Sequence, residues 1–173
     1  MKILLVDCDG TIRKPKSGAK FINKPTDQEP IPGATEALNH HVKEGWLIVG
    51  ITNQAGVAAG HKSLDNCVQE QQYTLRLFPQ LEAIYFCPDY GEQCYFVDRK
   101  NYRQCPKWLA NINFRKPGAG MLLKALIDFE GDKDESWMIG DRPEDEQAAV
   151  AAGVNFMWAD IWRERFRTGE YKV

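Results

Sequence analysis

Two aspartates separated by one residue follow a short apolar run near the start of the chain. The run is Lys2–Val6, and Asp7 and Asp9 come directly after it, ahead of Gly10 and Thr11. Residues i and i+2 of a strand lie on the same face, so both carboxylates can address one ligand. A carboxylate is ionised at pH 7 and can form a covalent phosphoenzyme. A second carboxyl group can protonate a leaving alkoxide and then accept a proton from water.

Polar residues of a similar kind end two later apolar runs. Thr52 and Asn53 follow the run 46–51, and Asp141 comes shortly after the run 137–139. Hydroxyl and backbone amide groups can donate to phosphate oxygens. Clustered carboxylates favour a hard divalent cation such as Mg²⁺, which offsets the charge of an approaching phosphate. We therefore expect a phosphate and a metal ion to share one site, with Asp141 supplying a further oxygen.

Each of these groups is ambiguous when taken alone. An Asp-x-Asp-Gly sequence is most often a turn or a helix cap, and a Thr-Asn pair after a strand is most often turn chemistry. The Lys-Pro pair at Lys116 most often carries no function. Together, in this order and each beside a predicted strand or helix, they indicate one site, at which Lys116 supplies fixed positive charge.

The elements that must position these residues alternate along the chain. We predict strands at 2–6, 46–51, 83–86, 137–139 and 154–158, and helices at 33–44, 63–78, 117–129 and 143–153. Such alternation predicts an α/β fold with a mostly parallel sheet and helices on both faces. Ligands of such sheets bind at the carboxyl ends of the strands, where the polar residues gather. Residues 12–32 and 87–114 are predicted to be loops, the first of them a flexible flap.

Length and composition fit one globular domain over residues 1–173. The chain is 43% apolar and 27% charged with a net charge of −2, so no nucleic-acid footprint covers its whole surface. No apolar run reaches the ~20 residues of a membrane span, and no signal peptide is evident. The five cysteines form an odd set without an export signal, which favours a reducing, cytoplasmic location. We expect a monomer that makes no contact with a membrane.

Four segments resemble, in order, the motifs of the haloacid dehalogenase (HAD) superfamily of phosphatases. They are DCDGT at 7–11, ITNQAG at 51–56, RKPGAGML at 115–122 and MIGDRPEDEQAAVAAG at 138–153. Their detailed forms are similar to the branch of histidinol phosphatases and heptose-bisphosphate phosphatases, and polynucleotide 3′-phosphatases share much of the pattern. The resemblance implies a three-layer, Rossmann-like fold. The insert between the first two motifs is too short for a large cap domain.

The resemblance assigns roles to the acidic residues. Asp7 is expected to be the nucleophile that forms an aspartyl-phosphate, and Asp9 the general acid and then the base. Asp7, Asp9 and Asp141 are expected to hold Mg²⁺, with Asp9 acting through its backbone carbonyl. Asp145 is expected to orient the surroundings of the metal or Lys116 rather than to bind the metal directly.

The resemblance also implies which residues bind the substrate. Thr52 and Lys116 are expected to bind the phosphoryl group, with Asn53 beside them. Arg115 precedes the motif lysine, and an arginine in that place contacts substrate in the sugar-bisphosphatase relatives. A surface arginine without a role is the alternative interpretation of Arg115.

A zinc site is a further hypothesis. Relatives in this branch often carry a Cys/His zinc loop between the second and third motifs. Here Cys87 stands in the right place, but Asp89 replaces the expected histidine, and Cys94 and Cys105 do not form a Cys-x-Cys pair. Three thiolates and Asp89 could still form a tetrahedral zinc site. We favour reduced cysteines without a metal.

Three functions remain open at this point. The first is a Mg²⁺-dependent phosphatase acting on a small phosphorylated metabolite, either a sugar bisphosphate or histidinol phosphate. The second is a 3′-phosphatase acting on nucleic-acid ends, which the basic residues of 13–24 and the aromatic residues of 85–108 favour but the net charge does not. The third is a non-enzymatic phosphate-binding module, which the intact set of Asp7, Asp9, Lys116 and Asp141 disfavours.

Overall fold

A computed structural model describes residues 1–166 of the chain. Its strands are β1 (Ile3–Asp7), β2 (Arg13–Lys14), β3 (Glu29–Pro30), β4 (Leu47–Asn53), β5 (Leu81–Cys87), β6 (Tyr95–Val97), β7 (Tyr102–Gln104), β8 (Trp137–Gly140) and β9 (Asn155–Trp158). Its helices are α1 (Ala34–Lys43), α2 (Leu64–Leu77), α3 (Gly120–Asp128), α4 (Pro143–Ala152) and α5 (Ala159–Glu164). The last seven residues of the predicted domain, 167–173, lie outside the described residues.

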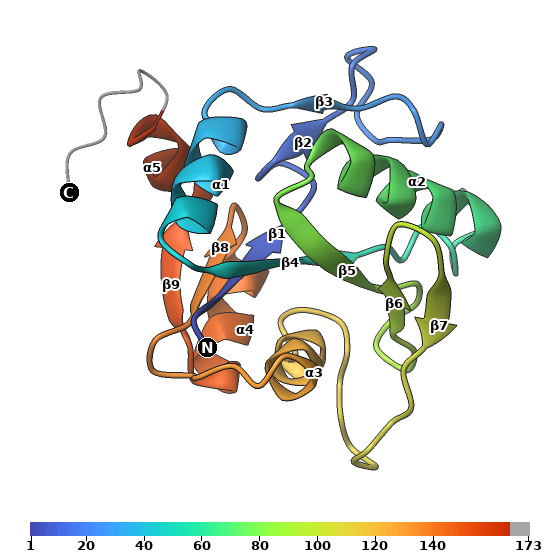
Figure 1. The fold of residues 1–173 in the computed structure, drawn as a ribbon. Coiled ribbons are helices and arrows are strands. Elements are labelled where there is room, and N and C mark those ends of the chain that lie inside the picture. Colours follow the sequence, from blue (N-terminus) through green and yellow to red (C-terminus); the bar gives the residue numbers. More distant parts are fainter. Residues whose placement is uncertain (167–173) are drawn as a thin grey trace.

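Strand β1 lies between β4 and β8 in a seven-stranded sheet with the order β7-β6-β5-β4-β1-β8-β9 (Figure 1). It pairs in parallel with β4 and with β8, and Asp7 is in register with Ile51. The strands β5, β4, β1, β8 and β9 all run in parallel. This confirms the predicted α/β fold, and it brings the carboxyl ends of β1, β4 and β8 to one edge.

Helices cover both faces of the sheet, with α3 and α4 on one side and α1, α2 and α5 on the other (Figure 1). All five residues of β1 are buried. Ile3 and Leu5 belong to the core beneath α3 and α4, and Leu4 and Val6 belong to the core on the opposite face. A strand buried on both faces appears in a sequence as a continuous apolar run, which is why β1 could be predicted without alternation.

The sequence predicted a loop over the whole of 12–32, but the segment contains two short strands. Its short strands β2 and β3 pair antiparallel, with Arg13 opposite Pro30. Farther along the segment, the hydroxyl of Ser17 donates a hydrogen bond of 2.6 Å to the carboxylate of Asp27. Arg13 is completely buried, whereas the four lysines of the segment are exposed: Lys14, Lys16, Lys20 and Lys24.

The prediction of one long loop over 87–114 is also wrong in part. Strands β6 and β7 form a hairpin that extends the sheet antiparallel from β5. Aromatic rings join the hairpin to β5, because Phe96 contacts Tyr85 edge-on and Tyr95 stacks on Phe86, with 5.3 Å between ring centres in each pair. These rings therefore pack the edge of the sheet. Among residues 1–166, no helix has the length and apolar character needed to cross a membrane.

Leu5→Ala tests how strongly the packing of β1 stabilises the fold. Leu5 is completely buried in the centre of the sheet, so removing its side chain should lower the free energy of unfolding by about 2–5 kcal/mol. Val150→Ala on α4 is the control, since Val150 is 75% exposed and should change stability by less than about 0.5 kcal/mol. Urea unfolding measures both. Equal losses in the two variants would contradict this assignment of the core.

Candidate active site

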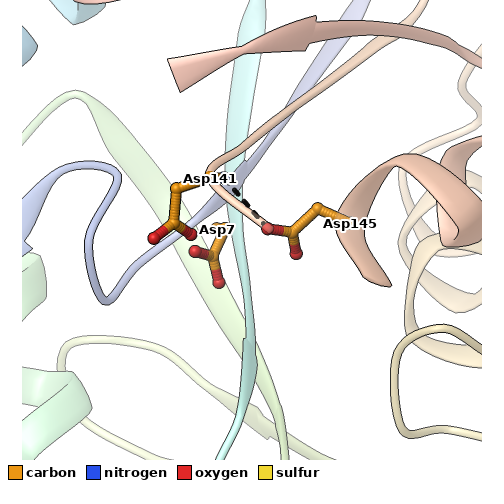
Figure 2. Close-up of side chains that lie close together, drawn as sticks. All are labelled: Asp7, Asp141 and Asp145. Atoms are coloured by element: carbon orange, nitrogen blue, oxygen red, sulfur yellow. Dashed lines mark hydrogen bonds between the residues drawn. The ribbon is translucent and has the colours of Figure 1, made fainter. Parts of the chain in front are cut away.

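Three carboxylates meet at the carboxyl edge of the sheet (Figure 2). Asp7 ends β1, Asp141 directly follows β8, and Asp145 lies in the first turn of α4. Each offers one oxygen, and the three oxygens lie within 4.8 Å of one another. Asp7 and Asp145 are buried, while Asp141 is exposed to solvent. The cluster therefore has one open side.

Lys116 places an ammonium group among these carboxylates. Its Nζ lies 2.7 Å from Asp7 Oδ1 and 2.7 Å from Asp145 Oδ1, and it donates to the backbone carbonyl of Ile51 over 3.0 Å. The side chain is only 3% exposed. Burial lowers the pKa of Lys116, but Asp7 and Asp145 outweigh burial and raise that pKa above its usual range. Lys116 is therefore a permanent positive charge.

The balance of charge in this cluster is negative. Burial raises the pKa of Asp7 well above its usual value, Lys116 lowers it by less, and the nearby carboxylates of Asp145 and Asp141 raise it further. The cluster thus holds three carboxylates and one ammonium group. An added divalent cation would relieve this repulsion, and carboxylate oxygens are the ligands that Mg²⁺ takes. The residues present therefore fit such a cation.

Both carboxylate oxygens of Asp145 contact other groups of the protein. Its Oδ2 accepts from the backbone N–H groups of Asp141 and Arg142, each over 3.1 Å, while its Oδ1 contacts Lys116. The first contacts cap α4, whose positive N-terminal end favours an acid. Both oxygens thus have partners, and Asp145 joins the loop after β8 to Lys116.

The residues of the second motif make several hydrogen bonds within the protein. The side chain of Asn53 exchanges two hydrogen bonds of 3.0 Å with the backbone of Lys116, one as donor and one as acceptor. Asn53 therefore aligns the motif lysine, while the second N–H of its amide takes no part in these two bonds. Thr52 is buried and accepts from Gln54 over 2.9 Å. Gln54 was not predicted as a site residue.

Asp9 lies apart from the three-carboxylate cluster. Its side chain is 50% exposed, and both of its oxygens contact the guanidinium of Arg13, at 3.0 and 3.3 Å. Gln54 donates to its Oδ2 over 3.0 Å. Burial acts to raise the pKa of Asp9, but the charge and hydrogen bonds of Arg13, with Lys62 and Gln54, lower that pKa below its usual value. Sequence reasoning had placed Arg13 among the surface charges of a flap.

Two further arginines lie near the motifs. Arg115 has a buried Nη1 atom with no hydrogen-bond partner among the described residues. Arg163 of α5 donates from Nη1 to the backbone carbonyls of Gly10 and Thr11, over 3.2 and 2.8 Å, and so anchors the loop after β1. Nothing in the pattern around Arg163 signals this contact, because it spans 152 positions to Thr11.

The predicted zinc residues do not converge on one point. Among residues 1–166, the carboxylate cluster is the one group of three or more side chains whose ligand atoms all lie within 4.8 Å of one another. The Sγ of Cys87 lies 3.4 Å from Asp89 Oδ1, and Cys94 and Cys105 contact each other across the start of the β6–β7 hairpin. All five cysteines are free and buried. Zinc binding here stays a hypothesis that we do not favour.

Known proteins share this sequence pattern and fold. The family model described as "Polynucleotide kinase 3 phosphatase" matches residues 2–162. A D-glycero-beta-D-manno-heptose-1,7-bisphosphate 7-phosphatase from Haemophilus influenzae is 31% identical over 157 residues, which are 88% of this chain and 78% of that protein. Its counterpart from Escherichia coli K12 is 31% identical over 155 residues, covering 87% of this chain and 74% of that protein.

Solved structures agree on the fold. A D,D-heptose 1,7-bisphosphate phosphatase from B. bronchiseptica, complexed with magnesium and phosphate, has a TM-score of 0.69 at 24% identity, over 90% of this chain and 79% of that one. A HAD-superfamily hydrolase from Geobacter sulfurreducens has a TM-score of 0.54 at 16% identity, over 90% and 88%. The sheet and its motifs are thus those of a HAD-like phosphatase. Within that class, the chain belongs to the polynucleotide kinase 3 phosphatase family, and it is a phosphatase.

Gly10→Ala tests the geometry of the cluster. Gly10 has a φ of +79°, and a Cβ atom there would collide with the carboxylate of Asp141. Gly18→Ala is the matched control, because Gly18 has a φ of +82° and nothing lies within 4 Å of its added Cβ. Both variants should lose ~1 kcal/mol of stability from backbone strain.

The two glycine variants should differ in their response to magnesium. With a Mg²⁺ ion bound at the cluster, Gly10→Ala should raise the Mg²⁺ concentration for half-maximal phosphatase activity by about 10-fold or more, the size of effect that changes around metal ligands have on metal affinity. Gly18→Ala should leave it unchanged. A shift of the same size in both variants would contradict the placement of Asp141 beside Gly10.

Proposed function

We propose that the protein is a Mg²⁺-dependent phosphomonoesterase that works through an aspartyl-phosphate on Asp7, with a small sugar bisphosphate as substrate. The observation that carries this proposal is the pairing of the buried Asp7 carboxylate with Lys116 at 2.7 Å, beside Asp141. The exposed carboxylate of Asp141 marks the open side of the cluster. A phosphate bound there would lie next to both an attacking oxygen and a fixed cation.

The first half-reaction transfers the phosphoryl group to Asp7. An oxygen of Asp7 attacks phosphorus, the bond to the leaving-group oxygen breaks, and Asp9 donates a proton to that oxygen. Lys116 stays charged and stabilises the phosphoryl oxygens, assisted by the hydroxyl of Thr52 and nearby backbone amides. A Mg²⁺ ion held by Asp7, Asp141 and the backbone carbonyl of Asp9 would offset the charge of the transferred group.

The second half-reaction releases phosphate. Asp9, now ionised, accepts a proton from a water molecule as that water attacks the phosphorus of the aspartyl-phosphate. The bond between phosphorus and Asp7 breaks, and Asp7 returns as a carboxylate. An ionised carboxylate is the form that accepts a proton. Asp145 takes no part in bond making and holds Lys116 in place.

The relatives support the choice of substrate. Those at about 31% identity are named as heptose-bisphosphate 7-phosphatases, which favours a sugar bisphosphate over histidinol phosphate. Arg115 is next to Lys116 in the chain, and its buried Nη1 has no hydrogen-bond partner among the described residues. We further propose that the protein acts as a monomer in the cytoplasm, with which its five free cysteines are compatible.

The second candidate is a 3′-phosphatase of nucleic-acid ends. The description of the matching family favours it, and so do the exposed lysines between β2 and β3. Two observations weaken it: Arg13 is buried rather than part of the basic surface, and the rings of Phe86 and Phe96 are buried rather than open for base stacking. Tyr90 and Tyr102 remain exposed.

Asp7→Asn should abolish turnover without unfolding the protein. The amide keeps the size of the side chain but cannot attack phosphorus, so phosphate release should fall by at least about 10³-fold. The assay compares heptose 1,7-bisphosphate, histidinol phosphate, common sugar phosphates and a 3′-phosphorylated oligonucleotide in Mg²⁺. Preferred release from the heptose ester supports the sugar-phosphatase proposal. Undiminished release by folded Asp7→Asn contradicts the assignment of Asp7.

Salt dependence separates the two candidate substrates. A protein that binds a nucleic-acid backbone through lysines loses affinity steeply as salt rises, roughly 10-fold or more between 50 and 200 mM for a few phosphate contacts. A sugar bisphosphate in a small site should show a much weaker dependence. Measuring kcat/KM for both substrates at the two salt concentrations tests this. Faster turnover of the oligonucleotide with a steep salt dependence would favour the second candidate.

A further inference from the structure

A buried network of charges connects Asp9 to helix α2. The guanidinium of Arg13 contacts Asp9 with Nε and Nη2, and its Nη2 also lies 2.8 Å from Oε2 of Glu70. Nη1 donates to Gln71 over 2.9 Å and to Thr74 over 2.6 Å. Every nitrogen of this guanidinium therefore has an acceptor. The contacts to α2 span 57 to 61 positions of sequence.

A second cation completes the network on its other side. Lys62 contacts Oε1 of Glu70 over 2.7 Å and donates to Gln54 over 3.1 Å. The side chains of Arg13 and Glu70 are 0% and 2% exposed, and that of Lys62 is 10% exposed. Two cations thus balance two anions, Glu70 and Asp9. Charges buried to this degree are costly unless they are paired and hydrogen-bonded, and this network meets both conditions.

The network restrains one carboxylate of the site. Asp9 accepts from Arg13 on both oxygens and from Gln54 on Oδ2. Gln54 also donates to the hydroxyl of Thr52, so the side chain of Gln54 connects Asp9 to Thr52. An ionised carboxylate offers about four acceptor positions, and the N–H groups of Arg13 and Gln54 fill three. One position remains for a proton exchanged with a substrate, and the side chain is 50% exposed.

We propose that Arg13 and Glu70 are positioning residues that hold Asp9 in the orientation for proton transfer to the leaving group. This inference rests on the proposed function, because it assumes that Asp9 is the general acid. In the step concerned, Asp7 gains the bond to phosphorus, the leaving-group oxygen loses that bond, and the proton of Asp9 passes to the leaving-group oxygen. Arg13 touches neither the substrate nor phosphorus, and it acts through Asp9.

The leaving group distinguishes positioning from mere stabilisation of the fold. An alkoxide is a poor leaving group and needs the proton of Asp9, whereas a nitrophenolate leaves as an anion without it. Misplacement of Asp9 should therefore slow phosphoryl transfer from an alkyl ester and spare transfer from p-nitrophenyl phosphate. The parameter to compare is kcat/KM, because it reports steps up to transfer and excludes hydrolysis of the aspartyl-phosphate, which both substrates share.

The experiment uses three variants of the network. Arg13→Met removes the guanidinium, Arg13→Lys keeps the charge but not the two-nitrogen contact, and Glu70→Gln keeps the size but not the charge. Asp9→Asn provides the full effect of losing the acid. Arg99→Met is the control, since Arg99 is an exposed arginine outside this network that donates to the backbone carbonyls of Leu75, Phe78 and Leu81.

We expect Arg13→Met to lower kcat/KM about 10- to 100-fold for the alkyl phosphate that the wild type hydrolyses best. For p-nitrophenyl phosphate the loss should stay within about threefold. Arg13→Lys and Glu70→Gln should show the same selectivity with smaller losses, and they carry the test if Arg13→Met does not fold. Arg99→Met should lower thermal stability and affect both substrates equally.

Equal losses on both substrates in the Arg13 and Glu70 variants, with Asp9→Asn remaining selective, would overturn the positioning role while leaving the proposed function intact. The network would then serve the fold alone. A wild type that hydrolyses neither ester in Mg²⁺ would instead contradict the proposed function, and the inference would fall with it. Selective loss in the network variants, matched in direction by Asp9→Asn, supports both.

Discussion

The contact between Lys116 and the two buried carboxylates is the interaction on which the site depends. One ammonium faces Asp7 and Asp145 at 2.7 Å each, with Asp141 close by. Like charges about 4 Å apart repel by about 4 kcal/mol at the effective dielectric constant near a protein surface. Without Lys116, these carboxylates could not all stay ionised beside one another. With it, the cluster is still short of positive charge, which is why a divalent cation fits.

The topology of the sheet creates this cluster from distant parts of the chain. Strands β1 and β8 are neighbours, so Asp7 and Asp141 arrive side by side. The backbone of Lys116 is fixed by Asn53 from the end of β4, the neighbour of β1 on its other side. Asp145 then closes the arrangement from the first turn of α4. The parallel sheet thus sets where the site residues lie, and a few hydrogen bonds to the backbone orient their side chains.

The sequence predicted the parts whose signals are local. The strands β1, β4 and β8 appear as continuous apolar runs, and the polar residues that follow them gather at one edge as expected. The hairpin of β6 and β7 was missed because its strands have three residues each, and β7 is fully exposed and shows no alternation. The residue-level misses share another cause. The contacts of Arg13 with α2 and of Asn53 with the backbone of Lys116 join segments about 60 positions apart. A local sequence pattern does not indicate a partner at that distance along the chain.

The most direct test of the central claim is to trap the phosphoryl group on the protein. The enzyme would be mixed with ³²P-labelled substrate in Mg²⁺, quenched in acid within one turnover, and reduced with borohydride to mark the modified carboxylate for mass spectrometry. The predicted result is a transient, hydroxylamine-sensitive label on Asp7 that rises and decays at rates compatible with turnover. A label on Asp9 or on another residue, or turnover that proceeds with no labelled protein at any time, would contradict Asp7 as the attacking group.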